Sequence, residues 1–183
     1  MPTVFFDVDT QMDFLYPAGA LYVPGAEHIV PLIAQLNHHA LARRISLIST
    51  VDAHAENDAE FALWPPHCVA GTLGQRKPES TLLPQRALAP EIAPQMILEK
   101  QSVHCFTNPH LPGLLKAIGA DRCVVYGVVT EICVLNAALG LRARGYQVEI
   151  VTEAVREFSR ESAERMRDQF TFVSLASILP DAA

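Results

Sequence analysis

Short apolar runs alternate along the chain with segments whose apolar residues recur at helical spacing. Runs typical of buried strands cover residues 3–8, 45–51, 95–99, 122–128, 147–152 and 171–175. Helical spacing covers residues 27–43, 109–118, 131–144 and 160–168, and Gly145 is placed to end the third of these helices. Strands separated by helices predict a three-layer α/β/α, Rossmann-like fold with a parallel sheet of about six strands and right-handed crossovers. Residues 1–183 are expected to form one such domain, because no linker or repeat interrupts the pattern.

One connection is unusually long. A proline-rich segment covers residues 53–94 between the second and third predicted strands. Ordered connections of this length are more often functional than passive. In parallel sheets, ligands bind beyond the carboxyl ends of the strands. The long connection is therefore expected to form part of a binding site.

Reactive side chains follow four of the predicted strands. Asp9 follows the first strand, and Asp52 with His54 follows the second. Lys100 ends the third, and Cys133 lies shortly after the fourth. Each has a common structural explanation: aspartates cap helices, lysines are exposed, and single cysteines are often buried packing residues. Their convergence on one edge of the sheet favours a catalytic site.

Cys133 is the most informative of these residues. It stands where an apolar strand stops and a helical pattern begins. The positive end of the helix dipole and free backbone N–H groups favour a thiolate and a neighbouring oxyanion at such a position. Cys68, Cys105 and Cys123 lie in no comparable setting, and the four cysteines do not form a disulfide pattern, so free thiols are expected.

Composition limits the partners. The net charge is -6, and no block of lysines or arginines offers a basic face for nucleic acid or an anionic membrane. No apolar run approaches membrane-spanning length, and the first residues lack the pattern of a secretion signal, so a cytoplasmic location is expected. A charged fraction of 19% is low for a small monomer and predicts a homo-oligomer.

Several motifs together resemble the isochorismatase-like cysteine hydrolase family over nearly the whole chain. The pattern D-x-Q-x-D-F occurs at residues 9–14, the family's strand-end lysine is Lys100, and G-V-x-T-x-x-C occurs at residues 127–133. Within this family the chain is most similar to nicotinamidases, also called pyrazinamidases. Their D-x-H segment matches residues 52–54, and their W-P-x-H-C-V-x-G-T segment matches residues 64–72.

The resemblance implies a catalytic triad. Cys133 would be the nucleophile, Asp9 would accept its proton and return it to the leaving amine, and Lys100 would hold both groups by charge and hydrogen bonds. The three groups are expected to titrate as one coupled unit. The resemblance also implies a cis peptide bond between Val128 and Val129, with the amides of Val129 and Cys133 forming an oxyanion hole.

A metal site is also implied, with Asp52, His54, Glu60 and His67 as ligands. Nicotinamidases often carry a histidine six residues after the D-x-H histidine, where this chain has Glu60. Two imidazoles and two carboxylates suit a divalent transition metal such as zinc, iron(II) or manganese. The resemblance to nicotinamidases implies that the metal would bind the pyridine nitrogen of the substrate and orient its ring.

The expected substrate is a small amide. Phe14 and Trp64 match aromatic pocket positions of nicotinamidases, whereas Val103 stands in a segment where relatives commonly carry an aromatic residue. The leading hypothesis is hydrolysis of nicotinamide to nicotinate and ammonia, a reaction of NAD salvage. The alternative is another amide or ureide hydrolase of the family, acting on a carbamoyl or open-chain amide. A non-catalytic interaction domain and a hydrolase of isochorismate's vinyl ether are less favoured, because the triad positions are filled and the metal residues are present.

Overall fold

The computed structural model describes residues 1–84 and 95–179, so the end of the long connection, residues 85–94, lies outside the described residues. The strands are β1 Thr3–Val8, β2 Ser46–Asp52, β3 Met96–Lys100, β4 Arg122–Val128, β5 Gln147–Arg156 and β6 Thr171–Val173. The α-helices are α1 Met12–Leu15, α2 Val30–Ala42, α3 Leu111–Ile118, α4 Leu135–Arg142, α5 Arg160–Arg167 and α6 Leu175–Ile178. Short 3-10 helices are η1 Ala26–Ile29, η2 Ala59–Ala62, η3 Glu79–Thr81 and η4 Cys105–Thr107, and η5 Thr130–Val134 is a π-helical turn. Among the described residues, none of the helices has the length and apolar character needed to cross a membrane.

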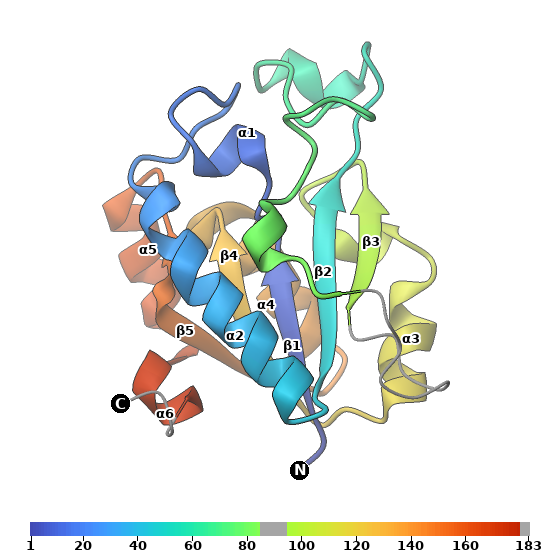
Figure 1. Cartoon of the computed structure of the whole chain (residues 1–183), viewed down its shortest axis with the longest axis vertical. Helices are drawn as coiled ribbons and strands as arrows, with labels where there is room; N and C mark the ends of the chain where they lie inside the picture. Colours follow the sequence, from blue (N-terminus) through green and yellow to red (C-terminus); the bar gives the residue numbers. More distant parts are fainter. Residues whose placement is uncertain (85–94, 180–183) are drawn as a thin grey trace.

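The six strands form one parallel sheet in the order β3-β2-β1-β4-β5-β6, which confirms the predicted fold class. The chain moves outward from β1 to β3, then returns to the other side of β1 with β4. Such a reversal opens a crevice between β1 and β4 at the carboxyl ends of the strands. In Figure 1 these ends point toward the upper edge, where the connections after β1 and β2 gather.

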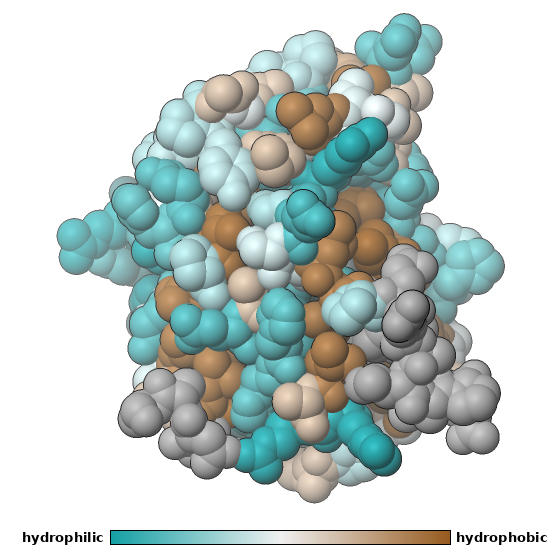
Figure 2. Space-filling view, viewed as in Figure 1, coloured by the Kyte–Doolittle hydropathy of each residue, from teal (hydrophilic) through white to brown (hydrophobic). Residues whose placement is uncertain are grey.

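Two layers of helices cover the sheet. Core residues of α2, η1 and α6 pack on one face, while those of α3, α4 and α5 pack on the other. Figure 1 shows α2 lying across the sheet in front and α4 behind it. Among the residues coloured in Figure 2, apolar side chains on this face form several groups separated by hydrophilic ones. Strands β1, β2 and β4 are buried from both sides, which explains their continuous apolar runs.

Several element boundaries differ from the sequence prediction, and four of these differences have a local cause. Strand β5 continues to Arg156, four residues beyond the predicted end, because its last residues pair with the end of β4 after a register shift. The predicted last strand stops at Val173, because Ser174 caps α6 and its side chain accepts a hydrogen bond from the amide of Ser177. The helix predicted from residue 131 begins with the π-helical turn η5, and the helix predicted from residue 27 begins with η1.

Strands β1 and β4 approach each other closely at the crevice. Gly127 pairs with Val8 and has a φ of 122°, a backbone conformation that side chains disfavour. A Cβ atom at Gly127 would also collide with the backbone carbonyl of Val8. Glycine is therefore required for β4 to lie directly beside the end of β1.

Candidate active site

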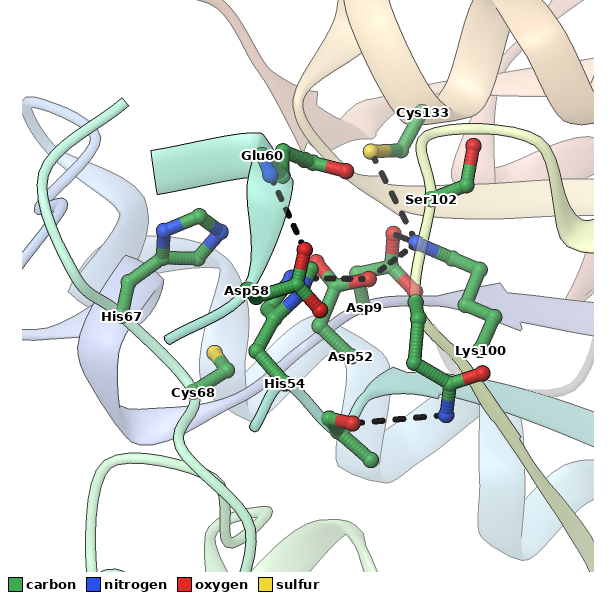
Figure 3. A network of polar contacts seen from close by, with 12 residues as sticks. Asp9, Asp52, His54, Asp58, Glu60, His67, Cys68, Lys100, Ser102 and Cys133 are labelled. Carbon is green, nitrogen blue, oxygen red and sulfur yellow. Dashed lines mark hydrogen bonds and ion pairs between the residues drawn. The ribbon is translucent and has the colours of Figure 1, made fainter. Parts of the chain in front are cut away.

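Lys100 joins the residues at the strand ends into one cluster. Its Nζ atom lies 2.8 Å from Asp9 Oδ2 and 4.0 Å from Cys133 Sγ. Asp9 follows β1, Cys133 lies in η5 after β4, and Lys100 is the last residue of β3. Thr50 of β2 donates a 2.7 Å hydrogen bond to Asp9 Oδ1 and fixes the other carboxylate oxygen. Figure 3 shows the lysine reaching across the sheet edge toward the acid and the thiol.

All three groups of this cluster are buried, so their charges are strongly coupled. Burial opposes the charge on Lys100, but attraction by Asp9, Cys133 and Asp52 outweighs it and raises the pKa of the ammonium well above its usual value. Burial also raises the pKa of the Cys133 thiol well above its usual value; Lys100 lowers it, whereas Asp9 raises it. Cys133 is therefore held as a thiol beside the side chain of Asp9.

Asp52 shares the same lysine. Its Oδ1 atom lies 2.5 Å from Lys100 Nζ and 3.9 Å from His54 Nε2. Burial and the neighbouring charge of Asp9 raise the pKa of Asp52 to about 7, although Lys100 opposes this shift. Asp52 thus connects the cluster around Cys133 to the histidines that follow β2.

Two buried histidines stand beside Asp52. The ring centroids of His54 and His67 lie 4.8 Å apart, and the ring of Phe61 packs against both. His67 Nδ1 lies 2.8 Å from the carbonyl oxygen of Pro65, and His54 Nδ1 lies 3.1 Å from Asp58 Oδ2. When Nδ1 donates its proton to an oxygen, the lone pair is on Nε2. The Pro65 carbonyl therefore favours Nε2 of His67 as a ligand atom, and the Asp58 carboxylate beside Nδ1 of His54 favours the same tautomer of that ring.

The residues fit a metal ion. Ligand atoms of Asp52, His54 and His67 all lie within 4.8 Å of one another. His54 Nε2 is buried and has no hydrogen-bond partner among the described residues. A bound metal ion would give this nitrogen a partner. Burial lowers the pKa of His67 and keeps its imidazole neutral, as metal binding requires. Glu60 lines the adjoining pocket but is outside this group of three, so its predicted role as a fourth ligand stays a prediction.

The turn that carries Cys133 has the predicted cis peptide bond between Val128 and Val129. After it, the amide of Val134 donates a 3.1 Å hydrogen bond to the carbonyl of Val129 and closes the turn. Val129 and Cys133 both line the pocket beside the cluster. Their amides are the groups expected to hold an oxyanion.

A pocket with about 280 Å³ of space between its atoms, part of it open to solvent, lies against Cys133. Its walls contain the three predicted substrate-binding residues, Phe14, Trp64 and Val103. Three other lining residues were not predicted from the sequence, namely Leu21, Ile132 and Phe158. Phe158 lies just beyond the end of β5, which the apolar pattern placed four residues too early. Asp58 was also missed, although three acidic residues in 56–60 mark that stretch as a source of ligands or their partners.

Gln11 and Asp13 hold the loops around the pocket. The side chain of Gln11 accepts a hydrogen bond from the amide of Asp52 and donates to the carbonyls of Asp52 and Gln75. Asp13 accepts hydrogen bonds from the amides of Ala20 and Cys68, and so links the loop after α1 to the connection after β2. This arrangement agrees with a structural function for Asp13 and a chemical one for Asp9.

Comparisons with known proteins agree with this arrangement. The family model described as the isochorismatase domain matches residues 3–177. A nicotinamidase from Acinetobacter baylyi is 27% identical over 81% of this chain and 78% of its own. A maleamate amidohydrolase from Pseudomonas putida is 30% identical over 81% of this chain and 69% of its own. The structure of a pyrazinamidase from Pyrococcus horikoshii in complex with zinc superimposes with a TM-score of 0.81 and 28% identity, over 95% of this chain and 99% of that one.

Proposed function

The chain belongs to the isochorismatase domain family of hydrolases, and we propose that it is a cysteine amidohydrolase that converts nicotinamide to nicotinate and ammonia. One observation carries the proposal: the cluster of Asp9, Lys100 and Cys133 opens into the same small aromatic-lined pocket as Asp52 and His67. Nicotinamide has a flat ring, a ring nitrogen and an amide, and these groups match the aromatic walls, the histidine cluster and the nucleophile.

In the proposed acylation step, the Cys133 thiol transfers its proton to Asp9 as sulfur attacks the amide carbon. The carbonyl oxygen becomes an oxyanion that accepts hydrogen bonds from the amides of Val129 and Cys133, each worth on the order of 3 kcal/mol in the transition state. The C–N bond then breaks, and the proton on Asp9 moves to the departing nitrogen. Ammonia leaves, and the acyl group stays on sulfur as a thioester.

In the proposed deacylation step, a water molecule attacks the thioester while Asp9 takes one of its protons. The same two amides hold the second oxyanion. The C–S bond breaks, and the proton on Asp9 returns to the sulfur of Cys133. Lys100 stays charged throughout, because its raised pKa keeps the ammonium protonated beside Asp9.

Asp52, His54 and His67 would hold a divalent transition metal, with Glu60 as the predicted fourth ligand. When bound, such an ion supplies a Lewis acid that can bind a ring nitrogen and orient the substrate. The remaining chemistry belongs to Asp9 and Cys133. A homo-oligomeric state and a cytoplasmic location are predictions that accompany this proposal.

A second candidate is hydrolysis of an open-chain amide. Val103 gives one side of the pocket an aliphatic wall. An aliphatic wall selects less strongly for a flat ring than an aromatic wall does. The similarity to a maleamate amidohydrolase also supports this alternative. Both candidates use the same triad, so they differ only in the pocket.

Ammonia release from a panel of amides tests the proposal. The purified, metal-loaded protein should hydrolyse nicotinamide and pyrazinamide with a higher kcat/KM than maleamate, ureidoacrylate or N-carbamoyl amino acids. Cys133→Ala should abolish all turnover and leave the fold and metal content unchanged. Turnover of open-chain amides without turnover of nicotinamide would select the second candidate, and turnover that survives in Cys133→Ala would refute both.

A further inference from the structure

Phe158 reaches the pocket from a distant part of the chain. It follows the end of β5, remains 38% exposed, and lines the pocket together with Trp64 from the connection after β2. The two rings stack with centroids 6.4 Å apart and an angle of 22° between their planes. They form one aromatic wall at the solvent-exposed side of the pocket.

Glu131 ties this wall to the turn that carries the nucleophile. Its Oε1 atom accepts hydrogen bonds from the amides of Phe158, at 3.0 Å, and Ser159, at 2.7 Å. Ser159 also caps α5, since its side chain accepts a hydrogen bond from the amide of Ser162. Glu131 lies two residues before Cys133 in η5. Glu131 therefore connects the backbone that carries the Phe158 ring to the turn that carries Cys133.

From this geometry we propose that Phe158 is a specificity-determining residue that stacks with Trp64 to favour flat aromatic amides, and that Glu131 is the positioning residue that holds it. Val103 supplies no aromatic face on its side of the pocket. A flat ring gains from an aromatic wall beyond the area it buries, whereas an open-chain amide has no π-face to contribute. The preference among amides rests on the proposed function, but the presence of an aromatic wall beside Cys133 can be tested without it.

The first experiment compares kcat/KM for nicotinamide and maleamate. Phe158→Ala should lower the value for nicotinamide about threefold to tenfold, mainly through KM, because ring pairs contribute that much beyond burial. The value for maleamate should fall by a smaller factor, because an open-chain amide has no ring to stack on this wall. Phe158→Tyr should retain the preference for the ring. Leu63→Ala is the matched control, because Leu63 is 83% exposed beside Trp64 and does not line the pocket.

The function of Glu131 is tested by the ratio of kcat/KM for nicotinamide to kcat/KM for maleamate, because a general loss of structure would lower both values and leave their ratio unchanged. Glu131→Ala should reduce the nicotinamide-to-maleamate ratio in the same direction as Phe158→Ala, because two amides lose their acceptor. Glu131→Gln keeps an acceptor oxygen and should restore most of the ratio. A loss of kcat for both substrates alike, without a change in their ratio, would show that Glu131 only supports the fold.

The second experiment replaces the substrate by reagents that alkylate Cys133. N-phenylmaleimide carries a phenyl ring where N-ethylmaleimide carries an ethyl group. Phe158→Ala should lower the ratio of the phenyl to the ethyl reagent's alkylation rate at Cys133 about threefold or more. An unchanged or increased ratio would overturn the stacking inference, even if nicotinamide is the substrate. If neither nicotinamide nor pyrazinamide is hydrolysed but the alkylation ratio falls, the proposed function fails and the aromatic wall stands. Phe158→Leu repeats the comparison if thermal melting shows that Phe158→Ala is unfolded.

Discussion

Replacing Lys100 by methionine tests the arrangement of charges at the centre of the site. Methionine has similar length but no charge, so Asp9 and Asp52 would lose the ammonium that lies 2.8 Å and 2.5 Å from their oxygens. Removing one partner of a buried ion pair costs about 3–5 kcal/mol of the free energy of unfolding. Asp52 can relieve part of this cost by taking a proton, because its pKa is already raised to about 7. We therefore expect a loss near the lower limit, about 3 kcal/mol at neutral pH.

Urea unfolding of metal-depleted proteins measures this loss without the stabilisation that metal binding adds. Thermal unfolding should show a decrease in Tm of roughly 6–12 °C, as about 3 kcal/mol implies for a domain of this size. Arg165→Met is the matched control, since Arg165 forms an ion pair with Glu161 in which both side chains are at least 64% exposed. Exposed pairs of this kind contribute at most about 1 kcal/mol.

A double variant makes the prediction specific. The double variant Lys100→Met with Asp52→Asn should be more stable than the sum of the two single losses predicts. Without Lys100, the buried carboxylate of Asp52 has no partner, and Asp52→Asn removes that unpaired carboxylate. Turnover by Lys100→Met should fall by roughly 10³-fold or more, since the triad acts as a unit. If Lys100→Met were no less stable than Arg165→Met, the lysine would not be stabilising the two buried acidic side chains beside it, and the proposed charge arrangement would be wrong.

Three further predictions concern single side chains. Asp9→Asn should lower kcat by roughly 10³-fold or more, whereas Asp13→Asn should lower it much less, because Asp13 accepts hydrogen bonds from loop amides. Steady-state kinetics with ammonia detection compares the two variants, and equal losses of kcat would show that the functions of Asp9 and Asp13 are misassigned. His67→Ala should remove most of the bound metal and Glu60→Ala less of it, as elemental analysis per subunit would show, and unchanged content in both would remove the metal site from the proposal. Asp58→Asn should weaken metal affinity about tenfold to a hundredfold, because the carboxylate beside Nδ1 no longer orients the His54 ring. A competition titration with a chelating dye measures this affinity, and an unchanged value would mean that Asp58 only caps η2.

The sequence predicted the sheet well because the central strands β1, β2 and β4 are buried from both sides, and buried strands leave continuous apolar runs. The ends of β5 and β6 were harder to predict. The register with β4 determines the last residues of β5, and the cap at Ser174 determines where β6 gives way to α6. Both depend on contacts between segments, which a local pattern does not contain.

The candidate site divides in the same way. Asp9, Lys100 and Cys133 were predictable because each stands at a strand end, and the parallel sheet brings those ends together. Asp58 and Phe158 lie in connections whose paths the apolar pattern does not determine. The η2 turn brings Asp58 to His54, and the hydrogen bonds of Glu131 bring Phe158 to the pocket. Position along the chain was therefore a good guide to which side chains meet at the sheet edge and a poor guide to the paths of the loops.

The contact between Gly127 and Val8 has a consequence for how this enzyme could be altered. The separation of the strands that carry Asp9 and Cys133 is set by main-chain atoms, without any side chain between them. If the proposed function holds, laboratory evolution of the pocket walls could exchange one substrate for another and leave the distance between Asp9 and Cys133 unchanged. Substitution of Gly127 itself has no such freedom: even alanine would push apart the two strands on which the reacting groups depend, and the damage could not be repaired by repacking neighbouring side chains.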